Sequence, residues 1–239
     1  MHTVFRFLRQ LLLTVLLLAL LTLVAAGGYF AVTGHKLYES AIQVTPIDTL
    51  YSSISSREGF VPYAQLPQTY INAVISAEDS RFTHHKGVDP VSIARALVTD
   101  LRTGSFAEGG STITQQLAKN LYFTQERSFI RKAAEMFMAF RLEQTYTKDE
   151  ILELYVNSIY FGDGYYCVRD ASEGYFGKEP GEMTDYESTL LAGIPNAPSV
   201  YSLTANPDLA EQRQQYVLRQ MEKYGYLDAQ EANAILQNG

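Results

Sequence analysis

Cysteine is nearly absent from this sequence, and its scarcity limits what the chain can be. The single cysteine, Cys167, can form no internal disulfide and no cysteine-based zinc site. It leaves the redox compartment open, because an exported domain can lack disulfides. Basic residues are also scarce: 19 lysines and arginines against 26 acidic residues give a net charge of −7, which argues against a nucleic-acid-binding protein. Hydrophobic residues make up 46% of the chain, which excludes wholesale disorder.

Strand-like alternation of apolar and polar residues is nearly absent as well, and the chain has no internal repeat. A short strand is expected only around Thr45–Tyr51. Helix start signals are frequent, including capping-box spacings at Thr147–Glu150 and Thr184–Glu187. Further starts are expected at Pro67, Asp89-Pro90, Ser111, Ser128, Asn206-Pro207 and Asp228, with Gly225 ending the helix before the last one. The sequence therefore predicts an all-α fold.

One long apolar run stands at the N-terminus. Arg6 and Arg9 precede an uncharged segment from Gln10 to Gly34, which exceeds the roughly 20 residues needed to cross the hydrocarbon core of a bilayer. The two arginines favour a cytoplasmic N-terminus. A signal peptide cleaved near Val24–Ala26 is the alternative, but the run outlasts a usual signal-peptide core. We expect a cytoplasmic stretch 1–9, a retained transmembrane helix 10–34, a polar approach segment 35–65 and a helical domain 66–239.

A carboxylate continues the apolar stripe of the helix that begins near Pro67. Ile71, Val74 and Ile75 define one face, and Glu78 lies on the same face seven residues after Ile71. Burial there would raise the pKa of the carboxyl group, which suits it to proton transfer. A Glu-Asp pair facing water at the end of a helix is the simpler alternative.

Two adjacent histidines follow this carboxylate. His84 and His85 point in different directions, so they cannot form the i, i+4 metal pair of a helix. A structural histidine beside a cleft is the favoured interpretation of His85.

A glycine-containing run from Glu108 to Asn120 lacks the spacing of a phosphate-binding P-loop. At 100° per residue, Thr112, Gln116 and Lys119 share one helix face, while Ile113 and Leu117 lie on another. One face can pack while the other offers hydroxyl, amide and ammonium groups. A solvated polar face remains the alternative to a binding face.

Cations then gather within a few residues of this acidic chain. Arg127, Arg131 and Lys132 would, together with Lys119, suit a diphosphate, because guanidinium groups bind phosphate oxygens through paired hydrogen bonds. An ordinary i, i+4 ion pair of Arg131 with Glu135 is the alternative. The same helix is apolar on most of its girth, which indicates contact with lipid.

These runs together resemble the family-51 peptidoglycan glycosyltransferases, found as the transglycosylase domain of class A penicillin-binding proteins and as monofunctional biosynthetic transglycosylases. The resemblance covers roughly residues 66–225. It departs from the family pattern at Val156, usually Leu, and at Cys167, usually Gly. Five signatures occur in the family's order: Glu78-Asp79 with Phe82, His85 and Gly87; Gly109 to Leu117 with Lys119-Asn120; Arg131-Lys132 with Glu135 and Leu142-Glu143; Ile151 to Glu153 with Tyr155 and Asn157; and Ala192 to Pro195 with Ala197 to Ser199.

The resemblance implies a lysozyme-like helical head and a smaller, membrane-associated jaw lobe, which we place roughly at 105–140. The expected location is the bacterial inner membrane, with one pass and the catalytic domain on the outer side. Expected partners are lipid II, the growing lipid-linked glycan and the membrane, with other cell-wall synthesis or division proteins also compatible. No nucleic acid is expected. No cofactor is required, although Mg²⁺ or Mn²⁺ held by Glu78 or Glu135 is compatible with the family.

The resemblance also implies a reaction. The family transfers a growing glycan from its undecaprenyl diphosphate to the 4-hydroxyl of the next lipid II, and the α-linked donor gives a β-1,4 product by inversion. Glu78 would be the general base, and Glu135 the second catalytic carboxylate, supporting the diphosphate site. Lys119, Arg127 and Arg131 would stabilise the leaving diphosphate. The remaining expected substrate-binding residues are Asp79, Phe82, His85, Arg95, Thr112, Gln116 and Asn120.

Two other functions are compatible with parts of this pattern. A lysozyme-like enzyme that cuts peptidoglycan would also need one glutamate, but it would not explain the clustered cations or the apolar anchor. An inactive membrane scaffold would not need the acidic and basic positions. We also expect sensitivity to moenomycin and indifference to penicillin, because no serine here has a lysine three positions later.

Overall fold

The computed structural model describes residues 2–103, 109–124, 126 and 128–239. Every regular element in these residues is helical, so the predicted all-α fold is confirmed. The strand expected around Thr45–Tyr51 is wrong: a 3-10 turn, Ile47–Thr49, leads directly into helix α2, Leu50–Ser55. Ile47, Leu50 and Ile54 are buried at spacings of three and four residues, a helical period that the surrounding polar residues had obscured.

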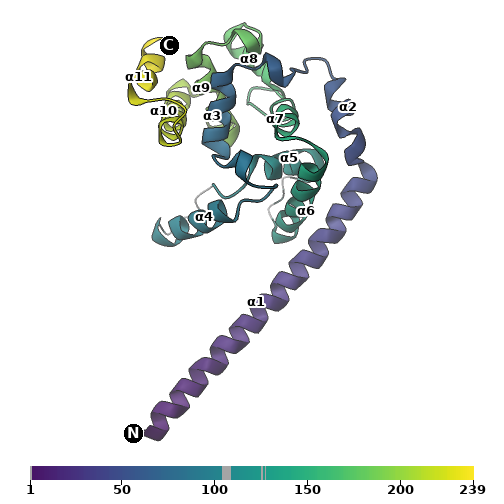
Figure 1. Cartoon of the computed structure of the whole chain (residues 1–239), viewed down its shortest axis with the longest axis vertical. Coiled ribbons are helices and arrows are strands. Elements are labelled where there is room, and N and C mark those ends of the chain that lie inside the picture. The colour runs from purple at the N-terminus through teal and green to yellow at the C-terminus, as the bar shows by residue number, and fades with distance from the viewer. Residues whose placement is uncertain (1, 104–108, 125, 127) are drawn as a thin grey trace.

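The N-terminal apolar run lies within a single helix, α1, that spans His2–Val44 (Figure 1). Its large apolar side chains from Val4 to Val24 are more than half exposed, and the helix is long and apolar enough to cross a bilayer. The helix continues for ten residues past Gly34, into the predicted approach segment. It ends where Pro46 disfavours helical backbone at the preceding residue.

Helix α1 packs along helix α6, Phe129–Thr145, and a glycine sets the closeness of that packing. A Cβ atom on Gly34 would lie 2.6 Å from Ala133 Cβ, so only glycine fits at this crossing. Phe30 stacks against Phe129 with ring centroids 5.4 Å apart, and His35 contacts Phe137 edge-on at 5.0 Å. The part of α1 from Phe30 onward therefore packs along α6, whereas the apolar side chains from Val4 to Val24 stay exposed.

The domain is built around helix α3, Gln68–Glu78, which packs against α9, Asp185–Gly193, and α10, Pro207–Lys223 (Figure 1). A second group joins α5, Ile113–Tyr122, to α6 and to α7, Lys148–Val156. Helices α4, Pro90–Thr103, α8, Val168–Phe176, and α11, Ala229–Gln237, complete the described helices. The core between them includes the fully buried rings of Tyr70, Phe82, Tyr155 and Phe161.

Local capping explains where several helices begin. The capping boxes predicted at Thr147–Glu150 and Thr184–Glu187 are confirmed. Gly225 adopts a φ of +77°, as expected of a residue that ends a helix. The start predicted at Ser111 is two residues early, because Thr112 is the N-cap and forms its own capping box with Gln115.

Two residues of the fourth signature hold the segment that leads into the domain. Glu153 Oε1 accepts a hydrogen bond from the Tyr63 backbone N–H at 2.6 Å. The buried side chain of Asn157 accepts from the Val61 N–H and donates to the Val61 carbonyl, both at 2.8 Å. These side chains satisfy the backbone of a segment without regular structure, which gives this signature a structural role.

Candidate active site

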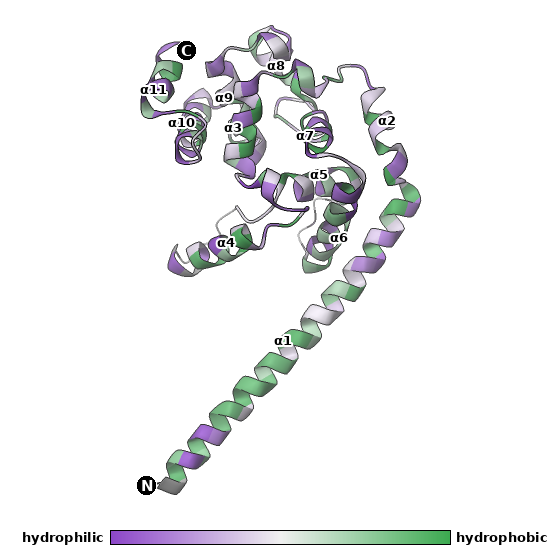
Figure 2. Ribbon diagram, viewed as in Figure 1, coloured by the Kyte–Doolittle hydropathy of each residue, from purple (hydrophilic) through white to green (hydrophobic). Residues whose placement is uncertain are grey.

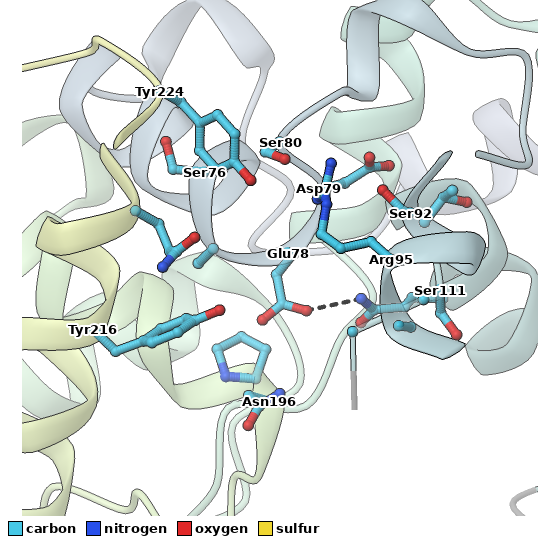
Figure 3. A pocket seen from close by; sticks show the side chains of 18 of the residues that line it. Ser76, Glu78, Asp79, Ser80, Ser92, Arg95, Ser111, Asn196, Tyr216 and Tyr224 are labelled. Atoms are coloured by element: carbon cyan, nitrogen blue, oxygen red, sulfur yellow. Dashed lines mark hydrogen bonds between the residues drawn. The ribbon is translucent and has the colours of Figure 1, made fainter. Parts of the chain in front are cut away.

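A pocket of about 580 Å³ opens where the C-terminal end of α3 meets α4, the start of α5 and α10 (Figure 3). Among the described residues, four cations line it, Arg95, Lys119, Arg213 and Lys223, against the carboxylates of Glu78 and Asp79. The pocket is thus locally cationic within a chain of net charge −7.

Glu78 is the last residue of α3, and its side chain projects into the pocket between Tyr216 of α10 and Ser111 on the opposite wall (Figure 3). The side chain is only 7% exposed. Oε2 accepts a hydrogen bond from Gln116 Nε2 at 2.8 Å, whereas Oε1 accepts none from the described residues. Burial raises the pKa of the Glu78 carboxyl, and the Gln116 hydrogen bond and the charges of Arg213 and Lys119 oppose that rise.

The amide of Gln116 is itself held in one orientation. Tyr155 donates its hydroxyl proton to Gln116 Oε1 at 3.1 Å, which turns the NH₂ group towards Glu78. Burial raises the pKa of Tyr155 well above its usual range, so the phenol stays protonated and remains a donor. This chain of contacts occupies Oε2 and leaves Glu78 Oε1, itself buried, as the carboxylate oxygen with unused capacity to accept a hydrogen bond.

Asp79, His85 and Thr112 fix the start of α5 through hydrogen bonds to one another's elements, although Asp79 and Thr112 also line the pocket. His85 Nε2 donates to Asp79 Oδ2 at 2.9 Å, and the Ile113 N–H donates to the same carboxylate oxygen at 3.0 Å. Thr112 Oγ1 donates to the Gly87 carbonyl at 2.6 Å. The N–H of Gly87 donates to His85 Nδ1 at 3.1 Å, which requires the histidine proton on Nε2.

Gly87 itself is required by close packing and backbone conformation. Its φ is +93°, and a Cβ atom there would lie 2.8 Å from the Ala139 carbonyl. The first signature therefore combines the carboxylate of Glu78, which projects into the pocket, with a group of structural contacts that joins the end of α3, the start of α5 and α6.

The structure places other predicted site residues outside the pocket. Phe82 is buried in the core, 2% exposed, beneath the Lys148 ammonium group at 4.3 Å. Asn120 is half-buried on α5 and does not line the pocket, whereas Arg95, Gln116 and Lys119 do line it. Arg127 lies outside the described residues, so its predicted contact with diphosphate stays a prediction.

Glu135 sits in an ion-pair cluster on α6 instead. Its carboxylate is 2% exposed and lies 2.9 Å from Arg131 Nε and 3.1 Å from Lys132 Nζ. Arg131 thus forms the i, i+4 pair that the sequence offered as the alternative. Lys132 also donates to Ser111 Oγ at 2.7 Å, and Ser111 lines the pocket, so the cluster adjoins the pocket wall. Burial lowers the pKa of Lys119, and the charge of Glu135 opposes this shift.

Neither carboxylate offered for a divalent cation fits one in this arrangement. Glu78 faces Arg213, and both oxygens of Glu135 are engaged by Arg131 and Lys132. Among the described residues, no three His, Cys, Asp or Glu side chains come together as ligands. We therefore derive no step through a metal.

One wall of the pocket was not predicted from the sequence. This wall comes from α10 and is lined by Arg213, Tyr216, Gln220 and Lys223; Tyr216 lies across Glu78 from Ser111 (Figure 3). Their spacing of three and four residues marks one helix face, but a solvated helix face has the same pattern. Only the packing of α10 against α3 distinguishes a helix face that lines the pocket from one that faces solvent.

Comparison with known proteins extends these observations. A model of the Transglycosylase family matches residues 45–222. The chain is 37% identical over 235 residues to penicillin-binding protein 1F of Bacillus subtilis, covering 94% of this chain and 33% of that protein. It is 45% identical over 179 residues to penicillin-binding protein 1A of Aquifex aeolicus, covering 74% of this chain and 25% of that protein.

The chain thus spans a third or less of the length of these curated relatives. A crystal structure of penicillin-binding protein 1A from Haemophilus influenzae aligns with a TM-score of 0.45 and 24% identity, covering 77% of this chain and 18% of that one. The family match and the curated relatives agree with the five signatures: the chain belongs to the transglycosylase family, the family-51 glycosyltransferases whose domain occurs in class A penicillin-binding proteins.

Proposed function

We propose that this chain polymerises lipid II into β-1,4-linked glycan strands, with Glu78 as the general base and undecaprenyl diphosphate as the leaving group. The observation that carries the proposal is the surroundings of Glu78. A nearly buried carboxylate keeps one oxygen free of hydrogen bonds from the described residues, inside a pocket lined by four cations. Such a carboxylate can take a proton from a sugar hydroxyl.

The proposed step is a single displacement. The 4-hydroxyl oxygen of the acceptor sugar forms a bond to C1 of the donor sugar, while the bond from C1 to the diphosphate oxygen breaks. Glu78 Oε1 takes the hydroxyl proton, and the leaving diphosphate carries the electron pair away. Lys119, on the α5 side of the pocket, is placed to stabilise the charge that develops there.

Inversion is supported by the state of the second carboxylate in the pocket. A retaining mechanism needs a carboxylate free to attack the sugar carbon and form a covalent intermediate. Asp79 is the other carboxylate that lines the pocket, and its oxygens are engaged by His85 and by the Ile113 N–H. This arrangement favours direct attack by the acceptor hydroxyl.

Exposed apolar surface supports a substrate in the membrane. Helix α4 exposes Val91, Leu97 and Val98, which are 47%, 59% and 47% exposed, and α6 begins with Phe129 at 75%. In Figure 2, α4 and the start of α6 lie on the side of the domain towards which the apolar part of α1 extends. We propose a single-pass protein of the bacterial inner membrane, with its domain on the outer side. The jaw lobe would include α4, which lies before the predicted range of 105–140.

The test uses purified lipid II in detergent, with glycan strands separated by gel electrophoresis. Wild-type chain should form strands, and Glu78→Gln should lower the rate by about 100-fold or more, because the amide cannot accept the proton. Glu173→Gln, an exposed substitution of the same kind on α8, serves as the matched control.

Each competing function gives a distinct result in this experiment. Cutting of preformed strands without polymerisation of lipid II would indicate a peptidoglycan-cleaving enzyme. Absence of both reactions would support a scaffold. A Glu78→Gln rate above about a tenth of the wild-type rate would remove Glu78 as the base. A parallel series with EDTA tests whether a divalent cation contributes.

A further inference from the structure

The side chain of Arg213 packs against a glycine at the end of the neighbouring helix α9. Gly193, at the C-terminal end of α9, has an ordinary φ of −79°, so its backbone does not require glycine. A Cβ atom there would lie 3.0 Å from Arg213 Cγ, tighter than ordinary van der Waals contact. A side chain at position 193 would therefore press on the arginine stem, which occupies the space beside the glycine.

The guanidinium group of Arg213 is held by rings more than by hydrogen bonds. Its centre lies 4.4 Å from the ring of Tyr216 and 5.8 Å from that of Tyr201. The side chain is 13% exposed, and its Nε atom is buried without a hydrogen-bond partner among the described residues. Burying a guanidinium group while one of its N–H donors has no partner costs folding free energy, so such a residue is expected to have a functional role.

The positive charge of Arg213 faces Oε1, the Glu78 oxygen that accepts no hydrogen bond from the described residues. Arg213 Nη2 lies 3.6 Å from Oε1, while Gln116 holds Oε2 from the opposite wall. The carboxylate is thus fixed through one oxygen and faced by a positive charge at the other. The separation is slightly beyond hydrogen-bond distance, so Oε1 keeps its capacity to accept a proton.

The other charged or titratable groups around Glu78 come from several elements. Asp79 follows it on α3 and opposes ionisation, Lys119 on α5 favours it, and the Tyr155 phenol on α7 stays neutral. Arg95 of α4 and Lys223 of α10 line the same pocket. Arg213 contributes more than Lys119 to offsetting the burial of Glu78.

We propose that Arg213 is a positioning residue that acts through Glu78: it keeps the buried carboxylate ionised and Oε1 aimed at the arriving sugar hydroxyl. The inference rests on the proposed function of Glu78 as the base. It assigns a role in the reaction to α10, which lies outside the five signatures and was not predicted from the sequence. It also gives a reason for the glycine in the fifth signature, since Gly193 admits the arginine.

The experiment measures the pH profile of kcat/KM for lipid II polymerisation in Arg213→Met, Arg213→Lys and the wild type. Arg213→Met removes the positive charge beside Glu78, so the acid limb of its profile should move upwards by about one pH unit. A shift of that size corresponds to a tenfold change in ionisation. The rate near neutral pH should fall, and part of it should return at higher pH. Arg213→Lys keeps the charge and should keep the acid limb near its wild-type position. Arg219→Met, an exposed substitution on the same helix, is the control.

The outcomes separate this inference from the proposed function. An unshifted acid limb in a folded Arg213→Met protein overturns the role of Arg213, even if the rate falls. Wild-type protein that fails to polymerise, or an active Glu78→Gln variant, overturns the proposed function instead. If Arg213→Met does not fold, the same pH profile is measured for Gly193→Ala. An upward shift of its acid limb supports the proposal, and an unchanged limb overturns it.

Discussion

The two oxygens of Glu78 have different surroundings, and this difference gives the residue its chemistry. Oε2 is fixed by an amide that a buried tyrosine orients, and Oε1 faces a cation without a hydrogen bond. Solvent reaches little of either oxygen, so the ionised form depends on protein groups. A carboxylate in this state is held in one geometry before any substrate arrives.

The first prediction concerns pH. The pKa of Glu78 is raised by burial, and only the ionised form can act as a base, so activity should be lost as the pH falls through that raised value. The acid limb of kcat/KM for lipid II should therefore lie above the ordinary glutamate pKa of about 4.3. Rates that stay constant down to that pH would show that Glu78 is not the group that titrates.

The second prediction concerns Lys119, a predicted diphosphate residue that lines the pocket. Moenomycin is expected by family resemblance to mimic the lipid diphosphate donor. Lys119→Ala should weaken its binding by about 1.5–3 kcal/mol, the range for hydrogen bonds to charged groups. Titration with labelled moenomycin measures this, with the exposed Lys86→Ala as control. Equal affinities for wild type and Lys119→Ala would place Lys119 outside the phosphate site.

At the scale of elements, several features of the fold depend on polar side chains that satisfy backbone groups. Asn157 makes hydrogen bonds to both backbone groups of Val61 and to the Glu153 carbonyl. The segment it holds joins α2 to α3 and has little regular structure of its own. Removing the side chain leaves buried backbone groups without partners, which costs more than the loss of the hydrogen bonds themselves.

The third prediction follows from this contact. Asn157→Ala should lower the free energy of unfolding by about 2–4 kcal/mol, because buried donors and acceptors lose their partners. Asn233→Ala removes one exposed helix contact and should change stability by less than about 0.5 kcal/mol. Denaturant melts of both variants in the same detergent compare them. Similar midpoints for the two would remove Asn157 as a structural clamp.

Sequence patterns predicted the elements that carry local signals. Capping boxes are short-range, so Thr147 and Thr184 could be identified as helix starts without tertiary information. No capping signal marks the continuation of α1 past Gly34. Residues 35–44 mix polar side chains with apolar ones such as Tyr38 and Ile42, and they gain helical order partly by packing on α6. Within the pocket, the apolar stripe offered Glu78 as a buried carboxylate, and the family resemblance assigned it the role of base. Arg213 was not predicted, because its role depends on which helix faces it.

At the scale of the whole molecule, part of the exposed apolar surface lies on the side of the domain towards the lower part of α1, where Figures 1 and 2 place α4 and the start of α6. The exposed residues of α4 and the first residue of α6 belong to it. Helices α1 and α6 run in parallel, since Phe30 meets Phe129 and Tyr38 meets Phe137. The start of α6 therefore lies closer to the apolar part of α1 than its end does.

The fourth prediction tests this surface. A fragment of residues 36–239 should still bind liposomes, because α4 and α6 retain exposed apolar side chains. Adding Leu97→Glu and Val98→Glu should reduce that binding, since charges resist entry into the interface. Co-sedimentation with vesicles measures both. A fragment that remains in the supernatant would limit membrane contact to α1.

The glycine crossing of α1 and α6 has a mechanical consequence. With α1 in the bilayer as proposed, the domain has no flexible tether, because the helix enters the fold unbroken and Gly34 brings its backbone against Ala133. The helix rises only about 15 Å between Gly34 and Val44, at 1.5 Å per residue. The domain therefore cannot rotate independently of α1, and its orientation in the plane of the membrane changes only when α1 itself rotates. A glycan strand growing from the pocket would leave in a direction that is fixed relative to α1.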